Sequence, residues 1–435
     1  MCSGLAPPAW ASTSLDSPAR AGSSTSITAS APRRSAGPPS KPWRRVAEET
    51  GVLKVGFIGL GRVSHENVLG YLDSPDARIT AVCCLLAEEA AQWLQQYHQP
   101  QARYYRHHQD MLDHEELDLV EILTPHHLHH AHATACARAG VRGISLQKPM
   151  AITLRQCDDI IAECRKQGVT LKVYENFLFY PVYVKAKELI GQGLIGELQS
   201  IRVHTMSGLR EGAPPPWCFS PDSWRGSIET CGTGPLVGDD GFHKFSLARW
   251  FMRRDLEKVS AWIDSESPLD APAFIRGKFR RQPGDCPKYA QIDFSFSPRM
   301  ALPFDFWLDD FVEIVGARGI LWINQCSAAG DREMFRGNEM SNSPVFPPIA
   351  VYLNGKVDVY LDNLSPPERN WSTSFVGSTR HFIEVMKHGG EPVYTGEEGR
   401  EVTRYAMAAY RSAREGRDVY LDEITAEAEE GNRAG

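Results

Sequence analysis

Hydrophobic and polar residues are arranged along the chain in two different ways, and the change between them falls near Gly196. Between residues 52 and 175, short apolar runs alternate with segments that have the apolar spacing of helices. The expected strands are residues 52–59, 78–84, 117–123 and 142–146, and the expected helices are 63–72, 87–97, 129–140 and 155–168. Strands that alternate with helices of this length are typical of βαβ units and a doubly wound parallel sheet.

After Gly196 the chain becomes a series of extended segments. The expected strands are residues 198–208, 257–264, 274–281, 289–297, 303–316, 319–324 and 349–362. Several of them alternate apolar with polar residues, which is typical of an antiparallel sheet with one buried face. Two helices, near 378–388 and 397–413, close the chain. The pattern therefore predicts a nucleotide-type α/β domain at 51–175, an α+β domain at 176–425 and a polar tail at 426–435.

Residues 1–50 have a different composition from the rest of the chain. The first 46 carry ten Ser, six Lys or Arg and a single acidic residue, Asp16. This composition predicts a disordered leader, because it offers too little apolar surface to bury. A transit peptide for an organelle and a misassigned start, with translation beginning near Val52, are the alternatives.

Overall composition excludes several classes of protein. The 42% hydrophobic and 23% charged residues are typical of a soluble globular protein. The net charge of −7 argues against nucleic acid as a partner, because phosphate contacts need a basic surface. No apolar run approaches the 18 or so residues of a membrane span. Ten cysteines without CxxC spacing indicate reduced thiols and predict a cytoplasmic protein.

A glycine-rich turn, Gly59-x-Gly61-x-x-Ser64, follows the first expected strand. Gly59 permits the tight turn, and Gly61 lets a pyrophosphate approach the backbone ahead of the next helix. About twenty residues later, where an acidic residue usually binds the cofactor ribose, the chain has Cys84 followed by two leucines. The motif predicts NAD or NADP as cofactor, with NAD slightly favoured.

Two other stretches carry residues suited to acid–base chemistry. Lys148 in "LQKPM" follows an expected strand, at the edge where α/β sheets bind ligands, and can polarise a substrate oxygen. In "GDDGFHKF", Asp239 and His243 are four residues apart, so a helix would place them on one face and let the acid orient the imidazole. The alternatives are a surface lysine before a turn, and a capping Asp beside a packed His.

These motifs, in this order and spacing, resemble the Gfo/Idh/MocA family, which includes glucose–fructose oxidoreductase and inositol dehydrogenases. The resemblance covers about residues 52–422. Besides the glycine turn, it rests on T-P-x-x-x-H at 124–129, the family's E-K-P motif at 147–149, "YENFLFYP", the Trp-Arg pair at 224–225 and D-x-G-x-H at 239–243. The closing "YRSAREGRDVYL" is similar to the family's terminal helix and strand.

The resemblance implies a Rossmann domain followed by an α+β domain whose large, mostly antiparallel open-faced sheet often mediates homo-oligomerisation, as a dimer or tetramer. It also implies hydride transfer between a nicotinamide and a secondary alcohol of a small-molecule polyol, sugar or glycoside. In this scheme His243 accepts the hydroxyl proton and Lys148 stabilises the charge that develops on oxygen. Asp239 holds the substrate hydroxyl or the imidazole.

The resemblance also assigns binding residues. Those expected to bind the cofactor are Gly59, Gly61, Arg62, Val63, Cys84, Thr124, Pro125, His129, Gln147 and Asn176. Those expected to bind the substrate are Lys148, Trp224, Arg225 and Asp239.

Two departures from the family pattern leave other functions open. Gln147 replaces the usual Glu beside Lys148, and Ser246 stands where a second Asp often follows the His. Besides a dehydrogenase, the sequence allows a glycosidase or lyase that uses tightly bound NAD in a transient oxidation–elimination cycle. It also allows a non-catalytic dinucleotide-binding regulator, although the retention of Lys148, Asp239 and His243 argues against one.

The stretch "TPHHLHHAHAT" (124–134) holds five histidines at the start of an expected helix. A zinc site needs three or four convergent ligands, and no other feature of the sequence requires a metal, so none is expected. Only His129 matches a family position. We therefore expect one functional histidine and four that lie on the surface where the helix begins.

Overall fold

The computed structural model describes residues 51–213, 223–264, 267, 269–301, 306–324, 348–360 and 370–427. All of them belong to one compact unit. The predicted leader at 1–50 and most of the predicted polar tail lie outside the described residues. Within these ranges no helix is long and apolar enough to cross a membrane.

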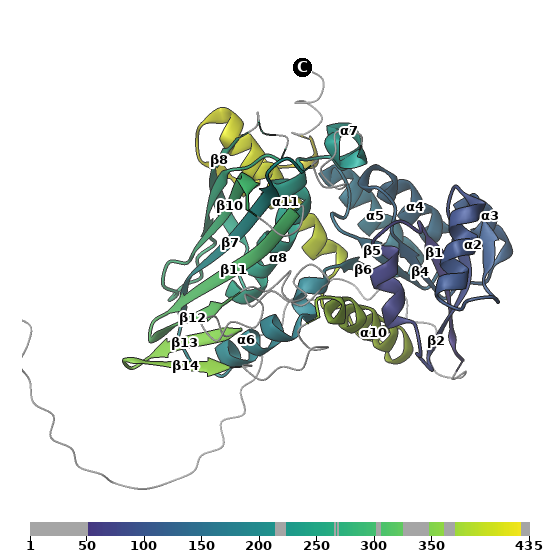
Figure 1. The fold of residues 1–435 in the computed structure, drawn as a ribbon, viewed down its shortest axis with the longest axis horizontal. Coiled ribbons are helices and arrows are strands. Elements are labelled where there is room, and N and C mark those ends of the chain that lie inside the picture. Colours follow the sequence, from purple (N-terminus) through teal and green to yellow (C-terminus); the bar gives the residue numbers. More distant parts are fainter. Residues whose placement is uncertain are drawn as a thin grey trace, which may run out of the picture. The chain divides into compact units, whose positions relative to one another are not determined.

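The first part of the chain forms a six-stranded parallel sheet in the order β3-β2-β1-β4-β5-β6 (Figure 1). Its strands are β1 (Leu53–Ile58), β2 (Ala77–Cys83), β3 (Arg103–Tyr105), β4 (Leu119–Ile122), β5 (Gly143–Gln147) and β6 (Thr170–Tyr174). Its helices are α2 (Ala87–Gln96), α3 (His108–His114), α4 (His126–Arg138) and α5 (Leu154–Gln167). The order of the strands reverses between β1 and β4, so their carboxyl ends form the crevice in which doubly wound sheets bind ligands.

The prediction of one regular helix at 63–72 is wrong. The chain instead forms a four-residue helix, α1 (Ser64–Asn67), followed by a 3-10 turn, η1 (Val68–Gly70). This tighter turn lies against α10 (Ser372–His388), where a Cβ on Gly70 would come within 2.4 Å of the Thr379 side chain. Close packing against a distant helix therefore replaces the regular helix that the local pattern predicts.

The second part forms a nine-stranded sheet in the order β14-β13-β12-β11-β7-β10-β9-β8-β15. Every pairing is antiparallel except that of β7 with β10. The strands are β7 (Leu198–Arg210), β8 (Leu256–Ile263), β9 (Ala273–Phe279), β10 (Tyr289–Met300), β11 (Phe306–Gly316), β12 (Gly319–Ile323), β13 (Ile349–Leu353), β14 (Lys356–Tyr360) and β15 (Val419–Tyr420). The predicted fold class, a Rossmann-type domain followed by an α+β domain with a mostly antiparallel sheet, is confirmed.

Three helices pack on the nine-stranded sheet: α6 (Pro181–Gly191) on β12, α8 (Gly241–Met252) on β7 and α11 (Gly396–Glu415) on β8 (Figure 1). The sheet also carries exposed apolar side chains that face one another across strands. Trp262 pairs with Phe274, and Tyr352 pairs with Val357. Part of this sheet is therefore apolar and exposed in the single chain.

A line of buried polar contacts fixes helix α10 against the six-stranded sheet. Lys172 Nζ donates to the Ser378 carbonyl at 2.8 Å, and the Tyr174 hydroxyl donates to the Phe375 carbonyl at 2.8 Å. Asn176, two residues beyond Tyr174, donates through Nδ2 to Ser374 Oγ at 2.9 Å. Lys172 and Tyr174 point to the same face because side chains alternate along a strand. These bonds hold the first turns of α10 beside the crevice.

Candidate active site

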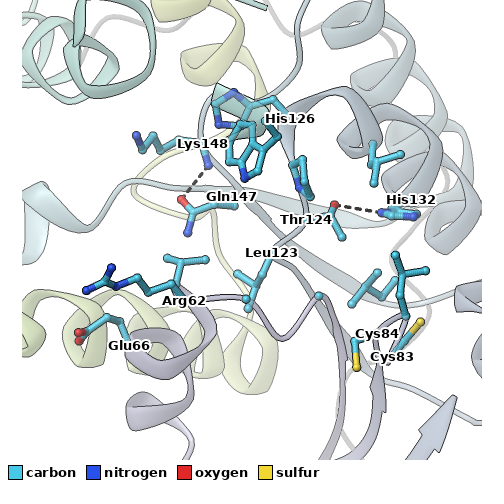
Figure 2. A pocket seen from close by; sticks show the side chains of 18 of the residues that line it. Arg62, Glu66, Cys83, Cys84, Leu123, Thr124, His126, His132, Gln147 and Lys148 are labelled. Atoms are coloured by element: carbon cyan, nitrogen blue, oxygen red, sulfur yellow. Dashed lines mark hydrogen bonds between the residues drawn. The ribbon is translucent and has the colours of Figure 1, made fainter. Parts of the chain in front are cut away.

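A cavity of about 730 Å³ opens at the carboxyl ends of the six-stranded sheet (Figure 2). One side is formed by the loops after β1, β2, β4 and β5. The other side carries Trp224, Arg225 and His243, together with Trp371 and Phe375 from the start of α10. The two parts of the chain that the sequence analysis distinguishes therefore both contribute to this one cavity.

The glycine turn after β1 has room for a bound pyrophosphate. Gly59 adopts a φ of +95°, and a Cβ there would lie 2.9 Å from the Leu123 carbonyl, so the turn itself requires glycine. A Cβ on Gly61 would meet nothing within 4 Å. Since packing does not require Gly61, its lack of a side chain leaves space beside the backbone for a ligand. The residues of this turn fit a dinucleotide.

Ser64, the last residue of the glycine-turn motif, has a specific hydrogen-bond partner in helix α2. Its hydroxyl accepts a hydrogen bond of 2.9 Å from Nε1 of the buried Trp93. A buried indole N–H without an acceptor is costly. Ser at this position therefore serves Trp93, a purpose that Gly or Ala could not meet.

The end of the cavity beside β2 has a mixed polar lining. Cys84 follows β2 as expected, with Leu85 and Leu86 exposed after it. Glu89 from α2 and Arg106 from the loop after β3 also line this end. Neither residue was predicted from the sequence. Glu89 lies beyond Cys84, within helix α2, and Arg106 follows the neighbouring strand β3.

Lys148 and Arg225 share one carboxylate, that of Asp239. Lys148 Nζ donates to Asp239 Oδ1 at 2.7 Å and to the Asp239 carbonyl at 2.8 Å, and Arg225 Nε donates to Oδ2 at 2.5 Å. Burial alone would raise the pKa of Asp239, but the two cations hold it well below its usual value. Asp239 is therefore ionised, and Lys148 keeps its third N–H for a group in the cavity.

The expected pairing of Asp239 with His243 on one helical face is wrong. Asp239 lies in a π-helical turn, η5 (Pro235–Asp240), where its N–H bonds to the Gly234 carbonyl five residues back. The carboxylate of Asp239 instead accepts hydrogen bonds from Lys148 and Arg225. Asp270 fixes this turn by accepting from the backbone N–H groups of Leu236 and Val237.

The carboxylate that orients His243 is Glu175, at the end of β6. His243 Nδ1 lies 2.7 Å from Glu175 Oε1, and the ring stacks on Phe177 with centroids 4.1 Å apart. A carboxylate can only accept, so Nδ1 carries the hydrogen and Nε2 is the basic nitrogen. Burial lowers the pKa of His243, opposed by Glu175 and assisted by Lys148. The imidazole is therefore neutral and ready to accept a proton near neutral pH.

Three of the five clustered histidines are buried, which corrects the expectation that all but His129 lie on the surface. His126 Nδ1 lies 2.9 Å from the Cys231 carbonyl, and His132 Nδ1 lies 3.1 Å from Thr124 Oγ1. Figure 2 shows His126 beside Lys148, and His132 further along the same wall. Their partners in the folded chain, rather than helical spacing alone, explain the burial.

His129 lies behind the cavity wall. Its Nε2 lies 2.8 Å from the Thr124 carbonyl, and its Nδ1 lies 2.9 Å from the Pro149 carbonyl. Burial lowers the pKa of His129 to about 4. The side chain ties together the loops after β4 and β5. Among the described residues, no group of three or more His, Cys, Asp or Glu is arranged to hold a metal ion.

Gln147, which stands in place of the usual Glu, has an amide available for a ligand. Its Oε1 accepts from the Lys148 backbone N–H at 2.9 Å (Figure 2), while its buried Nε2 has no hydrogen-bond partner among the described residues. A buried donor of this kind favours a ligand that supplies an acceptor. The substitution thus exchanges a negative acceptor for a neutral donor in the cavity wall.

Most of the sequence-predicted residues line the cavity, namely Gly59, Gly61, Arg62, Val63, Cys84, Thr124, Pro125, Gln147, Lys148, Asn176, Trp224, Arg225 and His243. Asp239 and His129 lie behind it and bond to residues or loops of the wall. Sequence reasoning missed Glu175 and His126. The signal for Glu175 was its place beside Asn176, immediately after an apolar extended segment.

Comparison with known families identifies two matching sequence profiles. The profile of the Gfo/Idh/MocA oxidoreductase family, NAD-binding Rossmann fold, matches residues 53–175. The profile of the same family's C-terminal alpha/beta domain matches residues 187–421. Together the two profiles cover most of the chain.

Several individual proteins are similar over nearly the same length. D-apiose dehydrogenase of Paraburkholderia graminis is 27% identical over 86% of this chain and 92% of its own length. Myo-inositol 2-dehydrogenase of Thermotoga maritima is 24% identical over 86% of this chain and 99% of its own. An Agrobacterium radiobacter oxidoreductase, solved in complex with NAD+, L-tartaric acid and magnesium, has a TM-score of 0.69 at 21% identity, covering 86% of this chain and all of its own. This last similarity concerns the fold.

Proposed function

The chain belongs to the Gfo/Idh/MocA family of oxidoreductases, and we propose that it transfers a hydride between NAD or NADP and a secondary alcohol of a sugar, cyclitol or glycoside. Its similarity to an apiose dehydrogenase and an inositol dehydrogenase supports a polyhydroxylated substrate. The observation that carries the proposal is the placement of Lys148 and the Glu175-oriented His243 on the wall of the cavity that also contains the glycine turn.

The cofactor would lie along the wall formed by the loops of the six-stranded sheet. The turn at Gly59 and Gly61 leaves space for its pyrophosphate, and Cys84, Glu89 and Arg106 lie at the end suited to the adenosine ribose. Thr124, Pro125, Gln147 and Asn176 would line its nicotinamide end. When bound, the nicotinamide would accept the hydride from the carbon that bears the substrate hydroxyl.

The side chains of this protein would move and stabilise the proton and charge of the alcohol. His243 Nε2 would accept the hydroxyl proton, and Glu175 would stabilise the resulting imidazolium through Nδ1. The remaining N–H of Lys148 would donate to the same oxygen and stabilise its developing negative charge. Asp239 fixes Lys148 and Arg225, so it acts as a positioning residue.

Incubating the protein with NAD+ or NADP+ and a panel of sugars, inositols and glycosides tests this proposal. We expect absorbance at the wavelength of the reduced cofactor to rise with at least one free sugar or cyclitol. If none of these alcohols reduced either cofactor, the proposed reaction would be wrong. Cleavage of a glycoside without accumulation of reduced cofactor would instead indicate a transient oxidation–elimination cycle.

Replacing Glu175 by Gln is expected to move the acid limb of the pH profile. In the wild-type protein, kcat/KM should fall on the acid side with an apparent pKa below 6.5, because burial lowers the pKa of His243. Glu175 raises that pKa, so Glu175→Gln should lower it further and shift the limb to more acid pH. Turnover on the plateau should fall about tenfold or more, since the imidazolium loses its counter-charge. A limb that moved to higher pH would contradict the assigned pairing.

We also propose a cytoplasmic homo-oligomer. Every cysteine described in the structure is a free thiol, which supports a reducing compartment. The exposed Trp262–Phe274 and Tyr352–Val357 pairs support association through the nine-stranded sheet. Native mass spectrometry of the purified protein would report the number of subunits and any bound dinucleotide together.

A further inference from the structure

The contacts of His126 fix a tautomer in which the lone pair of Nε2 can accept a hydrogen bond. Its Nδ1 lies 2.9 Å from the Cys231 carbonyl, which can only accept, so the hydrogen of the neutral ring is on Nδ1. Burial lowers the pKa of His126 to about 3, although Asp239 partly opposes this shift. The ring is therefore neutral near pH 7, and its Nε2 is a hydrogen-bond acceptor.

The surroundings of Nε2 are complementary to a hydroxyl group. Nε2 lies 3.6 Å from Asp239 Oδ1, which is also an acceptor and already receives Lys148 Nζ at 2.7 Å. Two acceptors that face each other gain nothing from this contact, so Nε2 favours a ligand that brings its own hydrogen-bond donor. A ligand hydroxyl supplies such a donor, while Lys148 keeps its remaining N–H for the oxygen of the reacting alcohol.

Lys148 is close to two histidines, His126 and His243, whose Nδ1 atoms are both bound by protein oxygens. Its charge lowers the pKa of both His126 and His243, and all three side chains line the same cavity. In each histidine Nδ1 is bound by a protein oxygen, which leaves Nε2 as the acceptor. His243 approaches from α8 and His126 from the start of α4, so the two acceptors come from different walls of the cavity.

We propose that His126 binds the substrate hydroxyl on the carbon next to the one that is oxidised, so that the site selects vicinal diols. This inference rests on the proposed function, in which the reacting hydroxyl lies between His243 and Lys148. Adjacent carbons hold their hydroxyl oxygens about one hydrogen-bond length apart, so a second hydroxyl beside the one bound by Lys148 can donate to His126 Nε2. Trp224 lies beside this subsite, in a T-shaped contact with His126 whose ring centroids are 4.5 Å apart, and lines the same cavity.

The test compares two ring alcohols that differ by one hydroxyl, cis-cyclohexane-1,2-diol and cyclohexanol. Their dissociation constants are measured by titration calorimetry on the full-length protein, saturated with whichever of NADH and NADPH binds more tightly. We expect the wild-type protein to bind the diol about fivefold more tightly than cyclohexanol, the value of one neutral hydrogen bond. His126→Phe should remove this difference by weakening the diol alone.

Two matched variants complete the experiment. His130→Phe makes the same change on the same helix, at a partly exposed histidine paired with Asp159, and should keep the wild-type ratio. His126→Gln, which retains an acceptor, should give an intermediate ratio. Equal binding of the two alcohols to the wild-type protein would overturn the proposal. So would a His126→Phe variant that keeps the ratio but binds the dinucleotide less tightly, because His126 would then serve the cofactor.

This measurement requires no turnover. The proposed dehydrogenase activity fails if no alcohol of the panel reduces a cofactor, whereas the role of His126 fails if the binding ratio is one. The two failures are therefore distinguishable.

Discussion

Replacing His243 by alanine is expected to lower kcat by about 10²- to 10⁴-fold, the usual contribution of a positioned general base. His243 is the imidazole whose Nδ1 is fixed by Glu175, and the residue lines the cavity together with Lys148. The alanine variant leaves Lys148, Asp239 and the glycine turn in place. Formation of reduced cofactor is the measurement, made with the best alcohol from the panel.

The binding of dinucleotide separates loss of the base from loss of the fold. His243 lies on α8, whereas the glycine turn follows β1, so the dissociation constant of NAD(H) or NADP(H) should stay within about twofold of the wild-type value. His243→Asn offers a second variant of similar polarity that cannot act as a base near neutral pH, and it should be as inactive as the alanine variant. Wild-type turnover in either variant would place the base elsewhere.

The fold could be predicted from sequence wherever burial follows a regular period. Strands β4 and β5 are buried at every position, including Glu121 and Ser145, and their mainly apolar runs without strict alternation indicated a parallel sheet. Strand β6, which contains Lys172, was not among the expected strands. That lysine is only 1% exposed, because its Nζ reaches the Ser378 carbonyl of a helix more than 200 residues away. A long-range partner of this kind leaves no periodic signal.

In the candidate site, too, local features could be predicted from the sequence and long-range contacts could not. Lys148 and His243 could be proposed because each belongs to a local motif with a clear relation to an expected strand or helix. Their partners could not be assigned, because the contact of His243 with Glu175 spans 68 residues and that of His126 with Cys231 spans 105. The one partner that spacing suggested, Asp239 for His243, depended on a regular α-helix where the chain forms a π-helical turn.

Replacing Lys148 by methionine is expected to reduce kcat by about 10²- to 10³-fold, because the oxygen of the reacting alcohol would lose its charged donor. The same change leaves the buried Asp239 carboxylate with Arg225 as its remaining cation. Removing one member of a buried ion pair costs about 3 kcal/mol of unfolding free energy, and Arg225 should keep the loss at or below that value. Urea unfolding and steady-state turnover measure the two effects separately.

The double variant Lys148→Met, Asp239→Asn distinguishes a catalytic lysine from a structural one. Neutralising Asp239 removes the uncompensated charge, so much of the lost stability should return, while turnover should stay as low as in Lys148→Met. Because Lys148 lowers the pKa of His243, that pKa should rise in both variants, and any residual activity should show its acid limb at higher pH than in the wild-type protein. Recovery of turnover together with stability would show that Lys148 acts only as the counter-charge of Asp239, and the assignment of Lys148 to the chemistry would be wrong.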